Sequence, residues 1–307
     1  MNTVRYSSEV ENFEQFNLKT QTSLENNLDE YHFLHQKFDR ERRILWLYMK
    51  PEGRQCFSIN LLKDMMAQHE LLLENHGIYY HEHIPYKVHY QVLTSEVGTP
   101  YNLGGDLELF IKYIKAKDRT LLREYAKLCI NVLHPTAINF DSTIKTISLV
   151  RGQALGGGFE SALSSSLLVA EKSAKLGLPE VLFNLFPGMG AYHLLARRLP
   201  TAQVEKMILS GRVYDAKELY DMGVVDILAE DGEGEKVIYD YVDKHKRHIN
   251  TQIGLQKARQ IYQPITHSEL MRVCDVWVDA AMQLESRDLR VMERLVKAQY
   301  RMGYEKN

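Results

Sequence analysis

The chain has 307 residues, of which 45% are hydrophobic and 25% charged, and its formal net charge is −2. This length and composition predict a globular protein of one large domain or two modest ones. The near-neutral charge gives no support to a nucleic-acid partner, and since no run of about 18 apolar residues occurs, no membrane span is expected. Cys56, Cys129 and Cys274 are scattered, which predicts reduced, buried thiols in a cytoplasmic protein.

The first part of the chain alternates expected strands and helices. Residues 1–30 are polar, lack the apolar core of a signal peptide, and are expected to form a partly disordered N-terminal segment. The apolar run at residues 44–49 predicts the first core strand. Residues 60–75 predict a helix capped near Gly77, and residues 88–93 predict another strand. This alternation favours an α/β core.

A first glycine cluster follows in the sequence Tyr-Asn-Leu-Gly-Gly-Asp-Leu at residues 101–107. It precedes a helical pattern at residues 107–133, so the glycines lie at a strand-to-helix turn. The first amides of a helix lack internal partners and lie at the positive end of its dipole. Gly105 is therefore a candidate donor to an oxyanion, whereas Asp106 can be only a helix N-terminal residue that the dipole favours.

A second glycine cluster, the triplet at residues 156–158, has the same setting. The β-branched run at residues 143–151 predicts a strand, and the apolar run at residues 159–169 predicts a buried helix. An oxyanion hole needs two N–H donors from different segments, so Gly105 and Gly157 are the natural pair. The alternative explanation is a tight turn in which backbone packs on backbone.

Two glutamates accompany the triplet: Glu160 follows it after one residue, Phe159, and Glu180 comes after Pro179. One carboxylate can take a proton next to a carbonyl group while a protonated carboxyl delivers a proton to a leaving group. Closely placed carboxyls in an apolar pocket can hold the two protonation states that this needs. Each also has a simpler explanation, because a helix dipole alone favours an acid in the first turn, and a residue after proline can begin a helix or face solvent.

The rest of the chain continues the α/β pattern and ends in helices. Residues 167–170 can form a strand, residues 204–210 and 216–222 predict short helices, and residues 223–228 predict another strand. From residue 267 to residue 302 apolar side chains recur at intervals of three and four, which predicts an amphipathic helical tail.

Four other patterns are candidate sites. Gly-Met-Gly at residues 188–190 lacks the third glycine of a dinucleotide site, and His-Glu-His at residues 81–83 lacks the spacing of a zinc motif, so neither a nucleotide cofactor nor a metal is expected. The serines at residues 164–166 lack a nucleophile-elbow pattern and are expected to be buried in a helix. The cations at residues 112–119 fit either an acidic carrier protein or a solvated helix face.

Four motifs in order resemble the crotonase (enoyl-CoA hydratase/isomerase) superfamily: Gly-Gly-Asp at 104–106, Ala-Leu-Gly-Gly-Gly-Phe-Glu at 154–160, Leu-Pro-Glu at 178–180 and Phe-Pro-Gly-Met-Gly at 186–190. The resemblance implies that the amides of Gly105 and Gly157 hold the oxyanion and that Glu160 and Glu180 are the acid/base pair. It implies an α/β fold, a spiral of β-β-α units, for residues 31–245. For residues 246–307 it implies a C-terminal helical segment that caps the pocket and packs between subunits.

The resemblance is closer to one branch, the diffusible-signal-factor synthases of bacteria. It rests on residues 101–107, 156–164 and 177–192, and on Trp-Val-Asp-Ala-Ala-Met-Gln-Leu at residues 277–284. Phe183 and Ala191-Tyr192 stand where ordinary hydratases tend to have a glycine and Gly-Thr-Gln. The branch implies an enzyme that dehydrates a 3-hydroxyacyl thioester on acyl carrier protein to the cis-2-enoyl thioester. It then hydrolyses that thioester to a free cis-2-unsaturated fatty acid, a quorum-sensing signal.

The same resemblance implies no cofactor beyond the phosphopantetheine that carries the acyl group on acyl carrier protein or CoA. It implies a homo-trimer or hexamer and a regulatory sensor protein as a partner. Met189 and Trp277 are candidates for the acyl pocket, although ordinary core packing explains each equally well. An enoyl-CoA hydratase/isomerase of fatty-acid metabolism is the alternative function, and a purely binding role is a third.

Overall fold

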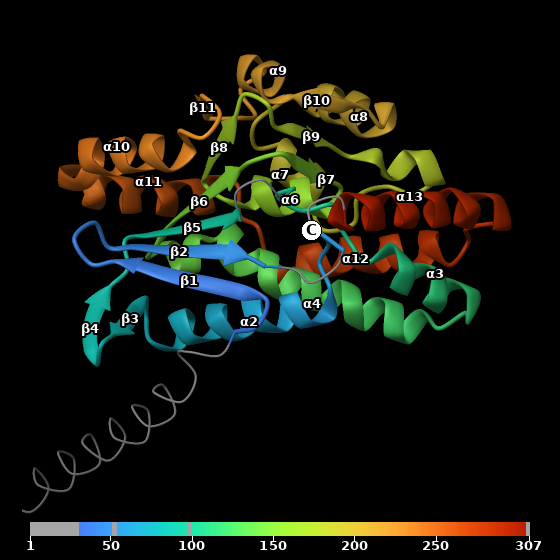
Figure 1. Cartoon of the computed structure of the whole chain (residues 1–307), viewed down its shortest axis with the longest axis horizontal. Helices are drawn as coiled ribbons and strands as arrows, with labels where there is room; N and C mark the ends of the chain where they lie inside the picture. The colour runs from blue at the N-terminus through green and yellow to red at the C-terminus, as the bar shows by residue number, and fades with distance from the viewer. Residues whose placement is uncertain (1–30, 51–53, 97–99, 305–307) are drawn as a thin grey trace, which may run out of the picture.

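The computed structural model describes residues 31–50, 54–96 and 100–304. The predicted N-terminal segment at residues 1–30 lies outside this part of the chain. Within it the α/β class predicted from the sequence is confirmed, because helices enclose a central, largely parallel sheet (Figure 1).

The central sheet has six strands in the order β1-β2-β5-β6-β8-β11. They are β1 (Leu34–Asp39), β2 (Ile44–Met49), β5 (Tyr90–Ser95), β6 (Lys145–Val150), β8 (Leu167–Glu171) and β11 (Ile227–Ala229). Only the pair β1 and β2 is antiparallel. Parallel strands are buried on both faces, and here neighbouring residues point into different hydrophobic clusters: Trp46 and Val92 into one, Leu45 and Leu93 into the other.

Two smaller sheets complete the strands. One has the order β10-β9-β7, formed by β10 (Val213–Asp215), β9 (Lys175–Gly177) and β7 (Gln153–Leu155). The other is the hairpin of β3 (Ile78–His81) and β4 (Ile84–Lys87). The short β7 immediately precedes the glycine triplet, so the small sheet fixes the point at which the chain turns into its next helix.

Helices cover both faces of the central sheet. The first half contributes α2 (Ile59–Glu74), α3 (Leu107–Lys115), α4 (Arg119–Ala137), α5 (Asn139–Ser142), α6 (Gly157–Ser164) and the 3₁₀ turn η1 (Pro179–Phe183). The second half contributes α7 (Ala191–Leu195), α8 (Thr201–Ser210), α9 (Ala216–Asp221), α10 (Gly234–His245), η2 (Lys246–His248), α11 (Ile249–Tyr262), α12 (His267–Ala281) and α13 (Ser286–Tyr304). Figure 1 shows α2 and α4 along one side of the sheet and α10 and α11 along another. Side chains of α2 and α4 join one hydrophobic cluster and those of α10 join the other.

Two predicted elements in the core need correction. Residues 44–49 are a strand but not the first, because β1 precedes them. The side chains of His35 and Lys37 on β1 are polar and exposed, which weakens the apolar signal of that strand. The helix predicted for residues 159–169 ends at Ser164, and residues 167–171 form the buried strand β8. A short, continuous apolar run cannot distinguish a buried strand from a buried helix by its period.

Smaller differences lie at element ends. The strand predicted for residues 223–228 shrinks to β11, because Gly223 adopts a positive φ of 78° in the preceding turn. Helix α2 ends at the cap Asn75, and His76 and Gly77 both take positive φ values after it. The predicted helical tail is confirmed and consists of two helices, with α12 packed on α4 and α13 packed on α3. The division proposed at residues 245 and 246 stays a prediction.

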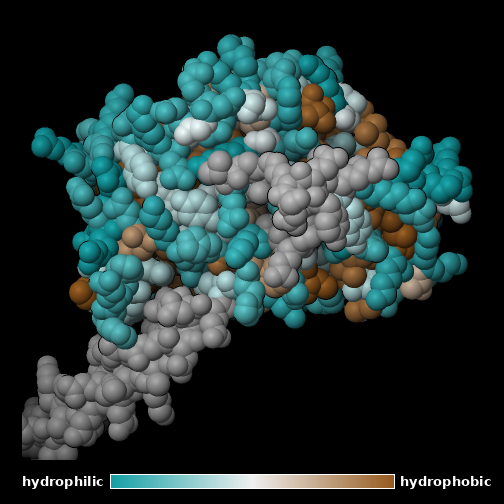
Figure 2. Space-filling model, viewed as in Figure 1, coloured by the Kyte–Doolittle hydropathy of each residue, from teal (hydrophilic) through white to brown (hydrophobic). Residues whose placement is uncertain are grey.

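The surface in Figure 2 is mostly hydrophilic, with apolar side chains gathered on the side where α3 and α13 lie. Across the described residues, no helix combines the length and apolar character needed to cross a membrane.

Candidate active site

The two glycine loops lie against each other. The chain passes from β7 through Gly156, whose φ of 53° and ψ of −125° suit glycine, into α6. A Cβ added at Gly157 would lie 3.5 Å from the amide nitrogen of Gly105, and a Cβ added at Gly104 would lie 3.2 Å from the amide nitrogen of Gly157. The structure therefore brings together the two amides that the sequence paired.

Backbone packing holds this arrangement. A Cβ added at Gly158 would lie 2.1 Å from the carbonyl oxygen of Asn102, so only glycine fits there. Asn102 also accepts the amide of Leu155 at 3.0 Å, and its side-chain oxygen accepts the amide of Gly104 at 2.8 Å. The tight-turn explanation thus holds together with the oxyanion hypothesis. Asn102 has no sequence pattern of its own, and sequence reasoning missed it.

Asp106 lies at the N-terminus of helix α3, the role that its simpler explanation predicted. Its side chain accepts the amide of Leu109 at 3.1 Å and caps α3. It also forms an ion pair with Arg54 at 2.6 Å. Asp106 is therefore engaged outside the cavity, and it anchors the loop that carries Gly105.

Glu160 and Glu180 are both buried, with 1% and 9% of their surfaces exposed. Oε1 of Glu160 accepts the amides of Met189 at 2.8 Å and Ala191 at 2.9 Å. Oε1 of Glu180 would lie 2.6 Å from a Cβ at Gly156, and its Oε2 is buried without a hydrogen-bond partner. Both carboxyls thus border the glycine triplet. Glu180 lies in the first turn of the 3₁₀ helix η1, as one simpler explanation had it, but it does not face solvent.

Burial makes both carboxyls hold protons unusually well. Desolvation raises the pKa of Glu160 to about 7, opposed by the hydrogen bonds from Ala191 and Met189. Desolvation, and then the charge of Glu160, raises the pKa of Glu180 to about 8. Because the two groups interact, near neutral pH the pair keeps one proton, and the hydrogen bonds to Glu160 favour its residence on Glu180.

A cavity of about 120 Å³ joins these groups. Gly105, Gly157, Glu160 and Glu180 all line it. Apart from the two carboxyls, most of its wall is apolar or backbone; the further side chains include Leu103, Leu107, Phe110, Tyr125, Cys129, Leu155, Phe183, Leu185, Met189, Cys274, Trp277, Leu295 and Gln299. This is an environment in which a developing oxyanion interacts strongly with fixed N–H groups.

The two acyl-pocket candidates line this cavity. The Sδ of Met189 would lie 3.0 Å from a Cβ at Gly157, next to the amide pair. Trp277 packs edge-on against Phe110 with ring centroids 5.1 Å apart, and its ring would lie 2.3 Å from a Cβ at Gly188. Both residues are therefore placed to contact an acyl chain, and their roles stay predictions.

Gln299 is a cavity residue that sequence reasoning missed. It lies on α13, only 5% of its surface is exposed, and its Nε2 donates to the carbonyl oxygen of Leu103 at 3.1 Å. Leu103 is two residues before Gly105, so α13 holds the glycine loop from outside. The amphipathic pattern of the tail could have indicated the buried face, but a buried polar residue on it gives no periodic signal.

The other candidate patterns lie elsewhere. Of the cations at residues 112–119, Lys115 pairs with Glu293 at 2.8 Å and Arg119 pairs with Asp279 at 2.8 Å, which attaches the C-terminal helices to α3 and α4. The His-Glu-His sequence lies at the β3–β4 turn. Throughout the described ranges, no group of three or more potential metal-ligating side chains occurs.

Comparison with known proteins identifies the family. Residues 86–252, more than half of the chain, match the family described as enoyl-CoA hydratase/isomerase. The chain belongs to this family. The crotonase-like fold predicted from the motifs is therefore confirmed.

Curated relatives match over limited stretches. A probable enoyl-CoA hydratase of Bacillus subtilis is 33% identical over 134 residues, which are 44% of this chain and 50% of that protein. The cyclohexa-1,5-dienecarbonyl-CoA hydratase of Thauera aromatica is 41% identical over 93 residues, which are 30% of this chain and 36% of that protein. The chain thus spans half or less of the length of these relatives.

The folds of solved structures match that of this protein over most of the chain. An enoyl-CoA hydratase from Bacillus halodurans superposes with a TM-score of 0.72 at 15% identity, covering 85% of this chain and 99% of that one. DspI from Pseudomonas aeruginosa superposes with a TM-score of 0.64 at 20% identity, covering 88% and 97%. At these identities the likeness shows the fold.

Proposed function

We propose that the chain catalyses the reversible addition of water across the C2–C3 double bond of a 2-enoyl thioester. One observation carries this proposal: two buried carboxyls and two neighbouring backbone amides, from different segments, line one largely apolar cavity. Membership of the enoyl-CoA hydratase/isomerase family supports it, as do curated relatives named as CoA hydratases.

The glycine amides stabilise the charge that develops in this reaction. Addition of water at C3, or loss of the proton at C2, moves negative charge onto the thioester oxygen. The N–H groups of Gly105 and Gly157 donate to that oxygen, with the positive end of the α6 dipole behind Gly157. One such donor typically contributes about 3 kcal/mol to the lowering of the barrier.

The two carboxyls exchange the roles of acid and base between the directions. In hydration, Glu160 takes a proton from water as the water oxygen bonds to C3, and Glu180 gives its proton to C2. The proton of the pair has then moved from Glu180 to Glu160. In dehydration Glu180 takes the C2 proton, and Glu160 protonates the departing hydroxyl, which leaves as water. No cofactor is needed for either direction, because the thioester itself accepts the charge.

The test is kinetic analysis of Glu160→Gln and Glu180→Gln with a 2-enoyl thioester. General acid–base catalysis typically contributes 10²- to 10⁴-fold, so we expect each variant to lose about that much of kcat while its circular dichroism stays that of the wild type. Glu230→Gln, which changes an exposed glutamate, is the control. Turnover at the wild-type rate in either folded variant would overturn the assignment.

A second, finer proposal is the signal synthase, in which the same cavity also hydrolyses the cis-2-enoyl thioester. Phe183 supports it, because this residue, where ordinary hydratases tend to have glycine, adds a ring to the cavity wall beside Glu180. The amide pair would hold the tetrahedral oxyanion of hydrolysis while a carboxylate activates water. An acyl carrier protein substrate, a sensor-protein partner, a homo-trimer or hexamer and a cytoplasmic location belong to this proposal.

Product analysis separates the two proposals. The enzyme is incubated with 3-hydroxyacyl-acyl carrier protein and, in parallel, with trans-2-enoyl-CoA, and the products are identified by mass spectrometry. Free cis-2-enoic acid from the carrier-protein substrate supports the synthase. If only reversible hydration of trans-2-enoyl-CoA is found, the synthase proposal fails and the hydratase proposal stands.

A further inference from the structure

A second cavity, of about 230 Å³, lies at the other end of α6. It is lined by Ala137, Asn139, Leu163, Ser164, Ser165, Ser166, Leu194, Arg197, Arg198, Gly223, Asp226 and Arg259, none of which lines the catalytic cavity. The first turn of α6 thus borders one cavity and its last turn borders the other. An eight-residue helix is about 12 Å long, which separates the two sites.

Cations dominate this second cavity. Three arginines line it against one acid, Asp226, although the whole chain has a net charge of −2. Arg198 satisfies that acid, because its Nη1 donates to both carboxylate oxygens at 3.0 and 2.9 Å. The one acid of the cavity lining is therefore paired with Arg198, and the positive charges of Arg197 and Arg259 remain unpaired within that lining.

No ion pair among the described residues involves Arg197 or Arg259. The Nη2 of Arg197 is buried without a hydrogen-bond partner. Burial, and then the charge of Arg259, lowers the pKa of Arg197 to about 10, with a smaller opposing effect from Glu269. The same charge of Arg259, after burial, lowers the pKa of Lys145 at the start of β6. Like charges therefore converge here, and among the described residues no acid forms an ion pair with either arginine.

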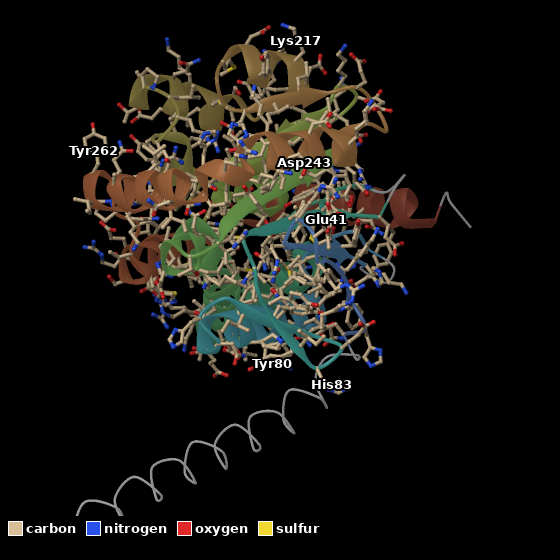
Figure 3. The ribbon with its side chains drawn as sticks, turned by 90° about the vertical axis from the view of Figure 1, so that its left-hand side faces the viewer. Glu41, Tyr80, His83, Lys217, Asp243 and Tyr262 are labelled. Atoms are coloured by element: carbon tan, nitrogen blue, oxygen red, sulfur yellow. The ribbon has the colours of Figure 1, made fainter. Side chains whose placement is uncertain are left out.

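The serine hydroxyls of this cavity are already committed. Ser164 donates to the carbonyl of Ser161 at 2.7 Å, and Ser166 donates to the carbonyl of Thr146 at 3.0 Å. The donors left for a ligand include the guanidinium groups of Arg197 and Arg259, and guanidinium groups favour planar, bidentate contact with oxyanions. Arg259 lies three residues before Tyr262, the last residue of α11, which Figure 3 labels at the side of the molecule along which α11 runs.

We propose that this second cavity binds a phosphate group between the guanidinium groups of Arg197 and Arg259. The polar lining of this cavity suits a small oxyanion or the phosphate end of a larger molecule. Two sources share this chemistry: free inorganic phosphate and the phosphorylated nucleotide of CoA. The bound anion removes the repulsion between the two arginines and so stabilises the fold.

The experiment is titration calorimetry of the full chain with inorganic phosphate and, separately, with adenosine 3′,5′-bisphosphate, at constant ionic strength set by chloride. We expect saturable binding that weakens at least tenfold in Arg259→Gln, whose exposed position makes the change tolerable. Arg247→Gln, which removes the same charge from an exposed 3₁₀ turn, keeps the wild-type affinity. Hydration of a phosphate-free enoyl thioester stays unchanged in Arg259→Gln, so failure of this proposal and failure of the proposed activity are distinguishable.

The two arms assign the source of the ligand. Equal affinities for both probes indicate free phosphate, whereas much tighter binding of the bisphosphate, with displacement by CoA, indicates the CoA nucleotide. Absence of saturable binding, or equal weakening in Arg247→Gln, overturns the proposal. Loss of an oligomer in Arg259→Gln during sedimentation, without phosphate binding by the wild type, also overturns it and assigns the arginines to an acidic surface of another subunit.

Discussion

The two ends of α6 border cavities that hold unpaired groups of opposite charge. At its first turn, Glu160 and Glu180 are buried together in a largely apolar cavity without a cation. At its last turn, Arg197 and Arg259 meet in a polar cavity without a free anion. The helix dipole suits both arrangements, because its N-terminal end favours negative charge and its C-terminal end favours positive charge.

The difference between the ends teaches how an unpaired charge is tolerated. A carboxyl can become neutral when it is desolvated, so the glutamate pair retains a proton and becomes useful for proton transfer. A guanidinium does not deprotonate near neutral pH, so the arginines keep their charge and are satisfied only by a ligand or a partner. The first end is therefore suited to chemistry and the second to binding.

The largest expected difference between the two ends of α6 is the stability lost when a tightly packed residue is changed. Gly158→Ala would place its Cβ 2.1 Å from the carbonyl oxygen of Asn102, which cannot move without separating the glycine loops. We expect a loss of at least about 3 kcal/mol in the free energy of unfolding, measured by urea denaturation. Ser164→Ala removes one hydrogen bond to Ser161 and should cost only about 1 kcal/mol. Equal losses in the two variants would contradict the contrast.

The pH dependence of stability tests the buried carboxyl pair. In the folded state the pKa of Glu180 is raised from 4.5 to about 8, so its neutral form is favoured. Its contribution to stability is present below pH 4.5 and is lost as the pH rises towards 8. Glu180→Gln should therefore be more stable than the wild type at pH 8, by more than about 1.4 kcal/mol, the equivalent of one pKa unit.

Thermal unfolding from pH 5 to pH 9 checks this prediction. The advantage of Glu180→Gln should grow with pH and then level off above about pH 8, whereas Glu230→Gln at an exposed site should show no such growth. An advantage that is constant with pH would mean that Glu180 is ionised in the folded state throughout.

Loss of the hydrogen bond from Gln299 on α13 to the carbonyl of Leu103 should reduce catalysis moderately. Gln299→Leu leaves the buried carbonyl of Leu103 without its 3.1 Å donor and loosens the loop of Gly105. We expect kcat to fall about tenfold with little change in KM, because the amide of Gly105 acts mainly in the transition state. Gln256→Leu, which changes a buried glutamine outside both cavities, is the control. A rise in KM alone would show that Gln299 only binds substrate.

The smallest expected effect concerns the second cavity. In buffer that contains no polyvalent anion, Arg259→Gln should stabilise the protein slightly, by no more than about 0.5 kcal/mol, because it removes a like charge near Arg197. Added phosphate should reverse the order of the two melting temperatures. Destabilisation of the variant without phosphate would show that Arg259 has a stabilising partner.

Much of the first cavity could be predicted from the sequence, because each of its backbone donors and acids belongs to a short local motif. Gly105, Gly157, Glu160 and Glu180 could each be named from local patterns, and the structure places them around one cavity. The helix predicted across residues 159–169 is confirmed up to Ser164 but ends earlier than predicted, and β8 confirms the strand expected at residues 167–170. Burial on both faces erases the period that distinguishes a strand from a helix.

What the sequence could not supply depends on contacts between distant segments. Gln299 reaches Leu103 across 196 positions of the chain, and no local pattern encodes such a pairing. The second cavity likewise combines Arg197, two residues after the end of α7, with Arg259 from α11. Each arginine is unremarkable in its own segment, and only their convergence without an anion indicates a site.

The central claim is that Glu160 and Glu180 share one proton and pass it to and from the substrate. Hydration of a 2-enoyl thioester in deuterium oxide tests this most directly, with the product analysed by mass spectrometry. The account predicts that the wild type yields a 3-hydroxyacyl thioester with one deuterium at C2, and that Glu160→Gln and Glu180→Gln form this product about 10²- to 10⁴-fold more slowly. Labelling at C2 by folded Glu180→Gln at the wild-type rate would contradict it.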